Sequence, residues 1–469
     1  MPLSTWTSKA LFAGILLALG GGLYQAWQEH RALGYGFRVP VIAPPAAKPA
    51  AMAPKKIARK KVRGRWRSQE EVIETNGTHF ETHFASSKLH TQTHAASLVE
   101  LKDGRVRAFW FSGSREGASD VTINSAVYDP ARSAWSDEQV VASRGSTQRA
   151  LHRYVAKLGN PVVGRAADGS LQLFYVTVSL GGWAGSSITH MTSHDEGATW
   201  SAPRRLVTSP FLNISTLVKG APFLYADGTM GLPVYHESIS KFAELLRLDE
   251  AGRVLDKQRL ARAGQGTLQP VVLVKNKNEA LVLTRYAGKQ APPRVPSLFT
   301  EDGGRSWSTP QPSALANPNA AVTAVVLADG RLLAVLNNQE SGRDTLSLML
   351  SADGGNSWRV IHQLESLSAE RTSKFDEKLC RQVVASLAQN ADTNVAKAPP
   401  STVDHYVASA EARVRADGMC NFEFSYPYLI QVSNGDLHLA YTWNRTFIKH
   451  VMFDRAWLDK RIGKRDALH

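Results

Sequence analysis

The octet Ser193-His194-Asp195-Glu196-Gly197-Ala198-Thr199-Trp200 recurs in related form elsewhere in the chain. Residues 300–307 and 351–358 share with it the pattern S/T-x-D-x-G-x-S/T-W, which we call the Asp box. The aspartate can bond to nearby backbone, the glycine can take a positive φ, and the tryptophan can pack on the strands beneath. A turn repeated in this way predicts a repeat architecture built from β-hairpins.

A second kind of turn alternates with the Asp boxes. It is an Asp-Gly, Asn-Gly or Asn-Lys-Asn turn flanked by alternating apolar residues, which is a hairpin signal, and it occurs at 103–104, 168–169, 227–228, 276–278, 329–330 and 434–435. Roughly 20–27 residues after each such turn comes an Asp box or a degenerate relative of one, the relatives being Asp129…Trp135, Asp249…Gly252 and Asp454…Trp457. Six units of about four short strands predict an all-β, six-bladed β-propeller. A β-sandwich with a solenoid flank explains the regular spacing less well.

The first part of the chain differs in composition from the rest. Residues 10–27 are uncharged and mostly apolar, about the length that spans a bilayer as a helix, so residues 1–30 are expected to be a signal anchor or a cleaved signal. Residues 31–67 are rich in Pro, Ala and basic residues, and predict a linker, whose basic run is either solvated or lies on lipid headgroups. The propeller is expected over 68–469, outside the cytoplasm, in the bacterial periplasm.

The net charge of +14 could suggest nucleic-acid binding, but its distribution argues against this. Residues 1–67 hold 12 Lys or Arg and one acid, so they carry +11 and leave only +3 for the other 402 residues. A nearly neutral propeller predicts no nucleic-acid partner. The sequence leaves the oligomeric state open.

An insertion interrupts the repeat before the last blade, over about 366–420. It shows a helical pattern and contains Cys380 and Cys420. Outside the cytoplasm these could close a disulfide over about 40 residues; two free thiols are the alternative. The two cysteines do not have metal-ligand spacing. His90 and His94, four residues apart, could suggest a metal, but there is no helix signal and no third ligand, so neither a metal nor a cofactor is expected.

In a four-stranded antiparallel blade both kinds of turn lie on one face, so the loops after the second strands and before the first strands form the opposite face. These loops carry charged, amide and aromatic residues, the expected lining of a polar ligand site. Arginines there can bind a carboxylate through two parallel hydrogen bonds, and carboxyl groups can perform acid–base chemistry on a glycosidic bond. The candidates are Arg115, Glu116, Asp120, Asn160, Trp183, Glu237, Arg285, Asn319, Arg343, Tyr426 and Arg445.

The chain resembles the sialidase (neuraminidase) superfamily, and more closely bacterial predicted sialidases with BNR or Asp-box repeats, over roughly 80–460. The resemblance rests on the three Asp boxes and on 157–161, 233–237, 268–270, 317–319, 424–427 and 441–445. It implies hydrolysis of terminal sialic acid, and an order of site residues that Arg115, Asp120, Glu237, Arg285, Arg343 and Tyr426 could fill.

The roles that this resemblance implies are a carboxylate-binding arginine triad, Asp120 as acid/base, and Glu237 as the base for a Tyr426 nucleophile. The chain departs from the family in lacking an F/Y-R-I-P motif and in the short spacing between Arg115 and Asp120. Arg445 could therefore replace Arg115, and Glu116 could replace Asp120.

Each candidate also has a purely structural reading. Loop arginines can join neighbouring blades, Tyr426 can be a packing residue, and Trp183 can be a rim residue instead of a sugar platform. Three functions follow from these readings: an exo-glycosidase acting on terminal sialic acid or a related acidic sugar, another glycosidase or lyase on the same fold, and a non-catalytic glycan-binding or envelope-assembly propeller.

Overall fold

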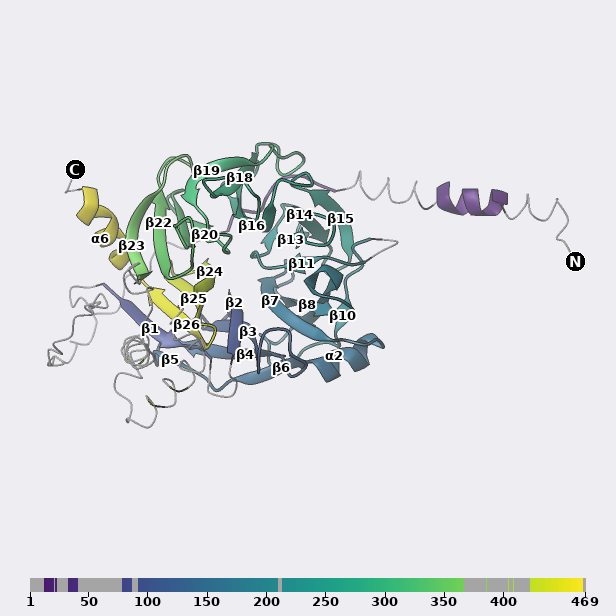
Figure 1. Ribbon diagram of the computed structural model, residues 1–469, viewed down its shortest axis with the longest axis horizontal. Coiled ribbons are helices and arrows are strands. Elements are labelled where there is room, and N and C mark those ends of the chain that lie inside the picture. The colour runs from purple at the N-terminus through teal and green to yellow at the C-terminus, as the bar shows by residue number, and fades with distance from the viewer. Residues whose placement is uncertain are drawn as a thin grey trace, which may run out of the picture.

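The computed structural model describes residues 12–20, 22, 33–40, 78–86, 92–209, 213–366, 385, 404, 408 and 422–466. Within them the strands form six antiparallel sheets arranged as the blades of a ring (Figure 1). The predicted six-bladed β-propeller is therefore confirmed. Cys380, Cys420 and nearly all of the insertion lie outside the described residues.

The innermost strands follow one another around the ring. They are β2 (Gln92–Glu100), β7 (Lys157–Arg165), β11 (Leu217–Val218) with β12 (Phe223–Leu224), β16 (Thr267–Val274), β20 (Thr323–Val326) and β24 (Phe424–Gln431). Each pairs with a second strand through one of the predicted hairpin turns: β3 (Val106–Gly113), β8 (Leu171–Val178), β13 (Met230–His236), β17 (Ala280–Tyr286), β21 (Leu332–Leu336) and β25 (Leu437–Trp443). We number the blades 1 to 6 in this order.

The outer strands complete the blades. They are β4 (Thr122–Asp129), β5 (Ala134–Trp135) and β6 (Gln139–Ser143) in blade 1; β9 (Ser186–Ser193) and β10 (Arg204–Arg205) in blade 2; β14 (Phe242–Leu248) and β15 (Val254–Arg259) in blade 3; β18 (Arg294–Thr300) and β19 (Gln311–Ala316) in blade 4; β22 (Thr345–Ser351) and β23 (Arg359–Ser366) in blade 5; and β26 (Phe447–Phe453) and β1 (Phe80–Phe84) in blade 6.

The two ends of the propeller meet in blade 6. Its fourth strand is β1, which comes from the start of the propeller and pairs with β26 from Phe80↔Phe453 to Phe84↔Lys449. Backbone hydrogen bonds between distant parts of the chain thus close the ring. The sequence pattern predicted a turn related to the Asp box at Asp454…Trp457 instead. There the structure starts helix α6 (Arg455–Asp466), because the Asp454 carboxylate accepts a hydrogen bond from the Trp457 backbone N–H at 2.8 Å.

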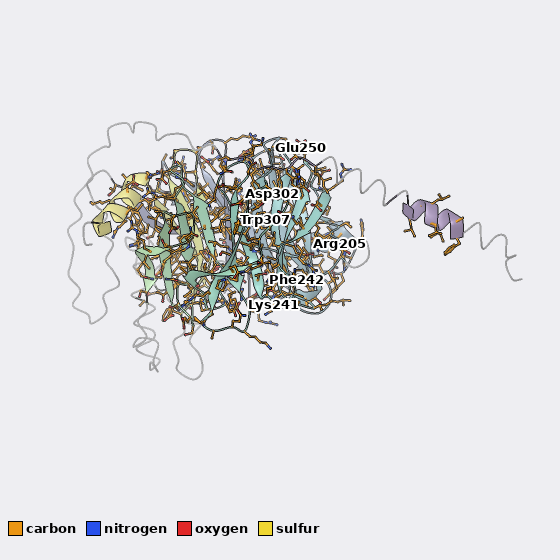
Figure 2. The ribbon with its side chains drawn as sticks, turned by 90° about the horizontal axis from the view of Figure 1, so that it is seen from above. Arg205, Lys241, Phe242, Glu250, Asp302 and Trp307 are labelled. Atoms are coloured by element: carbon orange, nitrogen blue, oxygen red, sulfur yellow. The ribbon has the colours of Figure 1, made fainter. Side chains whose placement is uncertain are left out.

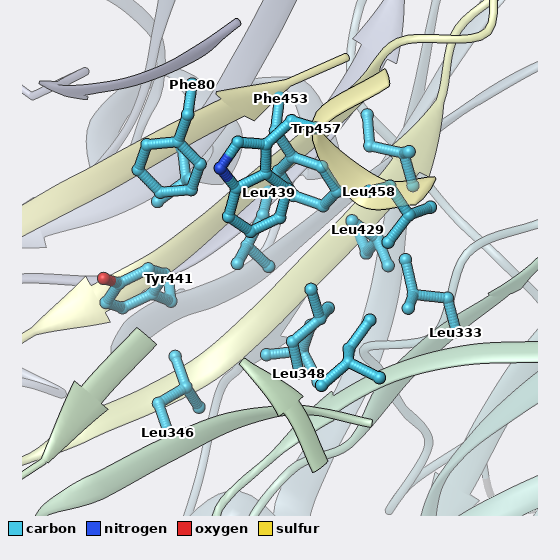
Figure 3. Close-up of a cluster of buried hydrophobic side chains, with 14 of the residues drawn as sticks. Phe80, Leu333, Leu346, Leu348, Leu429, Leu439, Tyr441, Phe453, Trp457 and Leu458 are labelled. Atoms are coloured by element: carbon cyan, nitrogen blue, oxygen red, sulfur yellow. The ribbon is translucent and has the colours of Figure 1, made fainter. Parts of the chain in front are cut away.

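The helix α6 covers a large apolar cluster at this closure. Trp457 packs on Phe80 of β1 and Phe453 of β26, with ring centroids 4.7 and 4.9 Å apart. Leucines of blades 5 and 6 complete the cluster beneath them (Figure 3). Burial of these side chains favours closure, since apolar burial contributes roughly 25 cal/mol per Å².

The Asp boxes form the turns that the sequence predicts. In the second box, Asp302 accepts hydrogen bonds from the Ser306 backbone N–H at 2.9 Å and from the Thr300 hydroxyl at 2.8 Å. Gly303 and Gly304 have φ values of 75° and 88°, a region that favours glycine. The Trp307 indole packs where blades 3 and 4 meet, in a cluster with residues such as Leu245 of blade 3 and Leu298 of blade 4.

The predicted transmembrane helix is not supported by the described residues. Residues 12–20 are helical and their apolar side chains are exposed, but no helix in the described part of the chain is long and apolar enough to cross a bilayer. The flanking residues of the predicted span lie outside the described ranges. Residues 33–40, which the sequence analysis assigned to the linker, pack against the propeller.

Candidate functional site

One face of the ring, which we call the mouth, is shaped by an unusual backbone position in each blade. A non-glycine residue with positive φ lies in or just before each innermost strand: Ala95, Asn160, Ser215, Gln269, Asn319 and Tyr426. In blades 1, 2, 4 and 6 the strand register shifts at this position, as in a β-bulge. Such conformations are uncommon outside glycine and gather at functional sites. Three of the six are predicted site residues: Asn160, Asn319 and Tyr426.

Three arginines lie along one arc of the mouth. Arg285, at the end of β17, donates from Nε to the Asn319 side-chain oxygen at 2.7 Å, and Arg343 donates to the Asn319 backbone oxygen at 2.8 Å. Asn319 therefore joins Arg285 to Arg343.

A carboxylate continues the arc. Glu423 accepts a hydrogen bond from Arg343 at 2.9 Å and one from Arg445 at 2.7 Å. Arg445 also binds the Glu116 carboxylate at 2.8 Å. The three arginines are thus adjacent members of one polar network, which fixes their guanidinium groups in place.

Tyr426 is connected to this arc through Gln269. The Gln269 amide donates to the Tyr426 hydroxyl at 3.2 Å and to the Tyr235 hydroxyl at 3.3 Å, while its carbonyl oxygen lies 3.5 Å from Arg285 Nη1. Asn160 donates to the same Tyr235 hydroxyl at 3.2 Å. Hydrogen bonds between side chains therefore join blades 2, 3, 4 and 6 around Tyr426.

Glu237 follows β13, where its backbone N–H donates to the Ser215 hydroxyl at 2.9 Å. Burial raises the pKa of its carboxyl group, which the charges of Arg285 and Lys241 partly offset. A half-buried carboxyl group with a raised pKa is suited to accept and release protons. Among the described residues no hydrogen bond joins the Glu237 carboxylate to the arc, and the charge of Arg285 acts on it through space.

The predicted residues of the β3–β4 loop divide into two groups. Glu116 binds Arg445 and so belongs to the network. Arg115 is exposed, and no interaction of its side chain links it to the arc in the described structure. Asp120 is also exposed, and it accepts hydrogen bonds from the Ser114 backbone N–H and hydroxyl at 2.9 and 3.0 Å. Arg445, the alternative to Arg115, therefore supplies the third arginine of the arc.

Trp183 lies at the rim between the second and third strands of blade 2. A Cβ atom on Gly159 would lie only 2.8 Å from its ring, so the indole packs directly over this glycine. Gly159 precedes Asn160, which places the aromatic face next to the polar network. Such a position suits stacking on a ligand ring, but packing alone also explains it.

Four members of this region were not among the predicted site residues: His94, Tyr235, Gln269 and Glu423. The His94 ring centroid lies 4.3 Å from that of Tyr426, and burial, together with the nearby arginine charges, lowers its pKa to about 3. Burial alone would raise the pKa of Glu423, but the charged guanidinium groups of Arg445 and Arg343 hold it well below its usual range. His94 is therefore neutral and Glu423 ionised near neutral pH. Tyr235, buried inside β13, has no sequence signal that separates it from a core residue.

The mouth carries hydrogen-bond donors suited to an anion. Among the residues that the structure describes, no three His, Cys, Asp or Glu side chains are placed to hold a metal ion. Three guanidinium groups lie on the mouth, and the Gln269 amide links the Tyr426 hydroxyl to one of them, that of Arg285. This arrangement can bind a carboxylate next to a polarised hydroxyl group.

The fold agrees with what comparison with known proteins shows. Residues 104–439 match the model of the BNR repeat-like domain, so the chain belongs to the BNR repeat-like family. No curated protein matches the chain in sequence.

Several solved structures share the fold. A Hadza microbial sialidase, Hz136, is similar over 79% of this chain and 67% of its own, with 15% identity and a TM-score of 0.56. The NanB sialidase of Streptococcus pneumoniae matches over 81% and 71%, with 10% identity and a TM-score of 0.56. The intramolecular trans-sialidase of Ruminococcus gnavus matches over 79% and 97%, with 12% identity and a TM-score of 0.55. At such identities the likeness establishes a sialidase-like fold, and the activity has to be argued from the site.

Proposed function

We propose that this protein is an exo-glycosidase that hydrolyses terminal sialic acid, or a related acidic sugar, from a glycan. The observation that carries the proposal is the arc of Arg285, Arg343 and Arg445 around Tyr426. An arginine arc matches a sugar that carries its own carboxylate at the reacting carbon. The solved sialidases of the same fold support this substrate class.

The proposed chemistry uses Tyr426 as the nucleophile. Its phenolic oxygen attacks the anomeric carbon and Glu237 takes the phenol proton, while the bond from that carbon to the leaving oxygen breaks. A carboxylic acid, Glu116 or Asp120, donates a proton to the leaving oxygen. Water then displaces the tyrosine from the sugar. The acid/base group takes the proton that the water loses, and Glu237 returns its proton to the departing Tyr426 oxygen. A neutral phenol suits this role better than a second carboxylate, because the sugar is already an anion.

Sugar release provides the test. The full-length chain is incubated with sialyllactose and with uronic-acid oligosaccharides, and free sugar is measured by mass spectrometry. Release of sialic acid that is lost in Tyr426→Phe and Glu237→Gln, but retained in Tyr286→Phe, would support the proposal. Tyr286 is a suitable control, since its hydroxyl donates to the Gln290 carbonyl and not to the arc.

Other outcomes separate the alternatives. Release that survives Tyr426→Phe would keep a glycosidase but exclude the tyrosine mechanism. No release from any acidic glycan, together with binding of free sialic acid, would favour a non-catalytic glycan-binding propeller. Comparison of Glu116→Gln with Asp120→Asn, on substrates with good and poor leaving groups, would identify the acid, because its loss slows only the poor substrate.

We further propose that residues 10–27 attach the protein to a membrane and that the propeller lies outside the cytoplasm. Exposed Phe12, Leu16 and Leu17 support this, with 65%, 54% and 78% of their surfaces accessible. Fractionation of cells that express the full chain, followed by protease treatment of spheroplasts, tests both parts. Recovery in the soluble fraction would exclude attachment.

A further inference from the structure

A short segment of the leader is built into the propeller. Residues 34–38, Gly-Tyr-Gly-Phe-Arg, which we call the strap, lie where blades 3 and 4 meet. Phe37 is only 2% exposed, although it precedes the propeller by about 40 residues in sequence. The strap is therefore a peptide ligand that the chain itself supplies.

Aromatic packing holds Phe37. Its ring stacks on Tyr225, with centroids 5.6 Å apart and an angle of 24° between the ring planes. It meets Phe223 edge-on at 5.6 Å and lies 6.4 Å from Trp307, the tryptophan of the second Asp box. Full burial of a phenylalanine is worth roughly 1.5–3 kcal/mol, enough to hold a short segment whose backbone is also bonded.

The backbone of the strap pairs with both blades. Phe37 donates to the Lys277 carbonyl at 2.7 Å and Gly36 donates to the Gly303 carbonyl at 3.0 Å, both in blade 4. Arg38 donates to Leu224 of blade 3 at 2.9 Å, and Gly36 accepts from Ala226 of blade 3 at 2.9 Å. The strap thus joins two adjacent blades.

Glycine and arginine residues of the propeller make the groove selective for this peptide. A Cβ atom on Gly303 would lie 2.4 Å from the Gly36 nitrogen, so only glycine allows this approach. The guanidinium of Arg305 lies 4.7 Å from the Tyr35 ring centroid and that of Arg247 lies 5.9 Å from it, which are cation–π distances. In the third Asp box the side chain of Lys275 occupies the corresponding space beside Gly354. The peptide site therefore belongs to the second Asp box and is not a general property of the repeat.

The strap lies on the face opposite the mouth. It contacts the turns that precede β13 and β17, whereas Glu237 follows β13 and Arg285 lies near the end of β17. Seven-residue strands such as these span about 20 Å. Figure 2 shows the same separation in blade 3, where Glu250 and Lys241 are at opposite ends, with Asp302 of the second Asp box towards the Glu250 end.

We propose that the groove between blades 3 and 4 is a peptide-binding site whose partner is the chain's own Tyr-Gly-Phe segment. Because the strap occupies this groove, the leader departs from the Asp-box face of the propeller. The mouth therefore points away from the membrane or other structure to which the leader is attached. A ligand then reaches the mouth from the opposite side. This inference does not depend on the mouth being a glycosidase site.

The first experiment empties the groove. Full-length Phe37→Ala is titrated with a fluorescein-labelled peptide of residues 33–40, and anisotropy is recorded. We expect the peptide to bind Phe37→Ala at least tenfold more tightly than the wild-type chain, whose groove is occupied. Val39→Ala is the matched control, because Val39 lies in the same segment and is 45% exposed; it should behave as the wild type. A peptide carrying alanine at position 37 should bind none of them.

The second experiment measures the direction of the leader in the otherwise wild-type chain, so that it does not depend on how a variant folds. A donor fluorophore is introduced at Gln28, six residues before Gly34, which limits its tether to roughly 20 Å. An acceptor is placed at Glu250 or at Lys241. We expect greater energy transfer to Glu250 than to Lys241, and loss of this difference in Phe37→Ala.

Two results would overturn the proposal. One is equal binding of the peptide to the wild-type, Val39→Ala and Phe37→Ala chains, or no binding to any. The other is energy transfer that is equal at the two acceptor positions, or greater at Lys241. Loss of sialic acid hydrolysis would not bear on either experiment, since neither uses catalysis.

Discussion

Lys219 and Pro427 meet across the ring, where the Lys219 ammonium donates to the Pro427 carbonyl at 2.5 Å. Lys219 follows β11 in blade 3, and Pro427 directly follows Tyr426 in blade 6. Burial lowers the pKa of Lys219 to about 7, and no carboxylate contributes to that shift. A buried amine of one blade thus supports the backbone that carries the candidate nucleophile of the opposite blade.

Stability should therefore depend on pH through Lys219. In the unfolded chain lysine titrates near its ordinary pKa of about 10.4, so between pH 7 and 10 the unfolded state binds more protons than the folded state. The free energy of unfolding of the wild type, minus that of Lys219→Met, should rise as pH increases through this window. Urea unfolding at several pH values measures this difference. A difference that stays flat from pH 7 to 10 would contradict a lowered pKa.

The affinity for sialic acid should fall when Arg343 is replaced, even by a residue of the same charge. In the wild type, two nitrogens of the planar Arg343 guanidinium bond separately to Glu423 and to Asn319. Arg343→Lys keeps the positive charge, but its single ammonium nitrogen cannot reproduce this geometry. We expect binding of sialic acid, measured by calorimetry, to weaken at least tenfold. Arg294→Lys is the control, because Arg294 is paired with the exposed Glu340 at 3.3 Å. Equal affinity in both variants would exclude Arg343 from the ligand site.

Acid should weaken the closure of the ring. His438 of β25 and His450 of β26 are buried with their ring nitrogens 3.0 Å apart, close to the closing strand β1. Burial lowers the pKa of His438 to about 4 and that of His450 well below its usual value, although Glu81 of β1 opposes both shifts. His83 of β1 also lies beside His450, with ring centroids 6.2 Å apart.

As the pH falls, these histidines bind protons in the unfolded chain at a higher pH than in the folded chain. Their contribution to the free energy of unfolding is therefore complete above about pH 6.5 and is lost as the pH falls towards 4. Chemical unfolding at pH 7.5, 6 and 5 should show a smaller loss for His438→Gln than for the wild type. The exposed His152→Gln should follow the wild type. A loss of the same size in all three proteins would assign the acid sensitivity to other groups.

The Asp box should serve stability and not ligand binding. Asp302→Ala removes the acceptor for Ser306 and Thr300, and the expected cost is roughly 1–3 kcal/mol. Asp302→Asn, which keeps one acceptor oxygen, should lose less. Thermal unfolding measures both, while the affinity for sialic acid should stay within twofold of the wild type. A tenfold change in affinity would contradict the separation of the two faces.

The sequence by itself determined the repeat. The Asp boxes and the hairpin turns are local motifs, in which an aspartate bonds to residues two to four positions away and a glycine takes a positive φ. Such patterns can be read from neighbouring residues, and they predicted six blades and the loops that form the mouth. They also placed Arg343 and Arg445 on these loops, whereas Arg285 and Tyr426, which were predicted to lie on them, are in strands β17 and β24.

Only the tertiary structure decided which of these residues meet. The choice of Arg445 over Arg115 depends on Glu423 and Glu116, which lie 22 and 329 residues away from Arg445 in sequence. The closing strand β1 and the strap also depend on contacts between distant parts of the chain, such as Phe80 with Phe453 and Gly36 with Gly303. Phe37 and Tyr235 look like ordinary aromatic residues in the sequence, because what distinguishes them is the set of neighbours that folding brings around them.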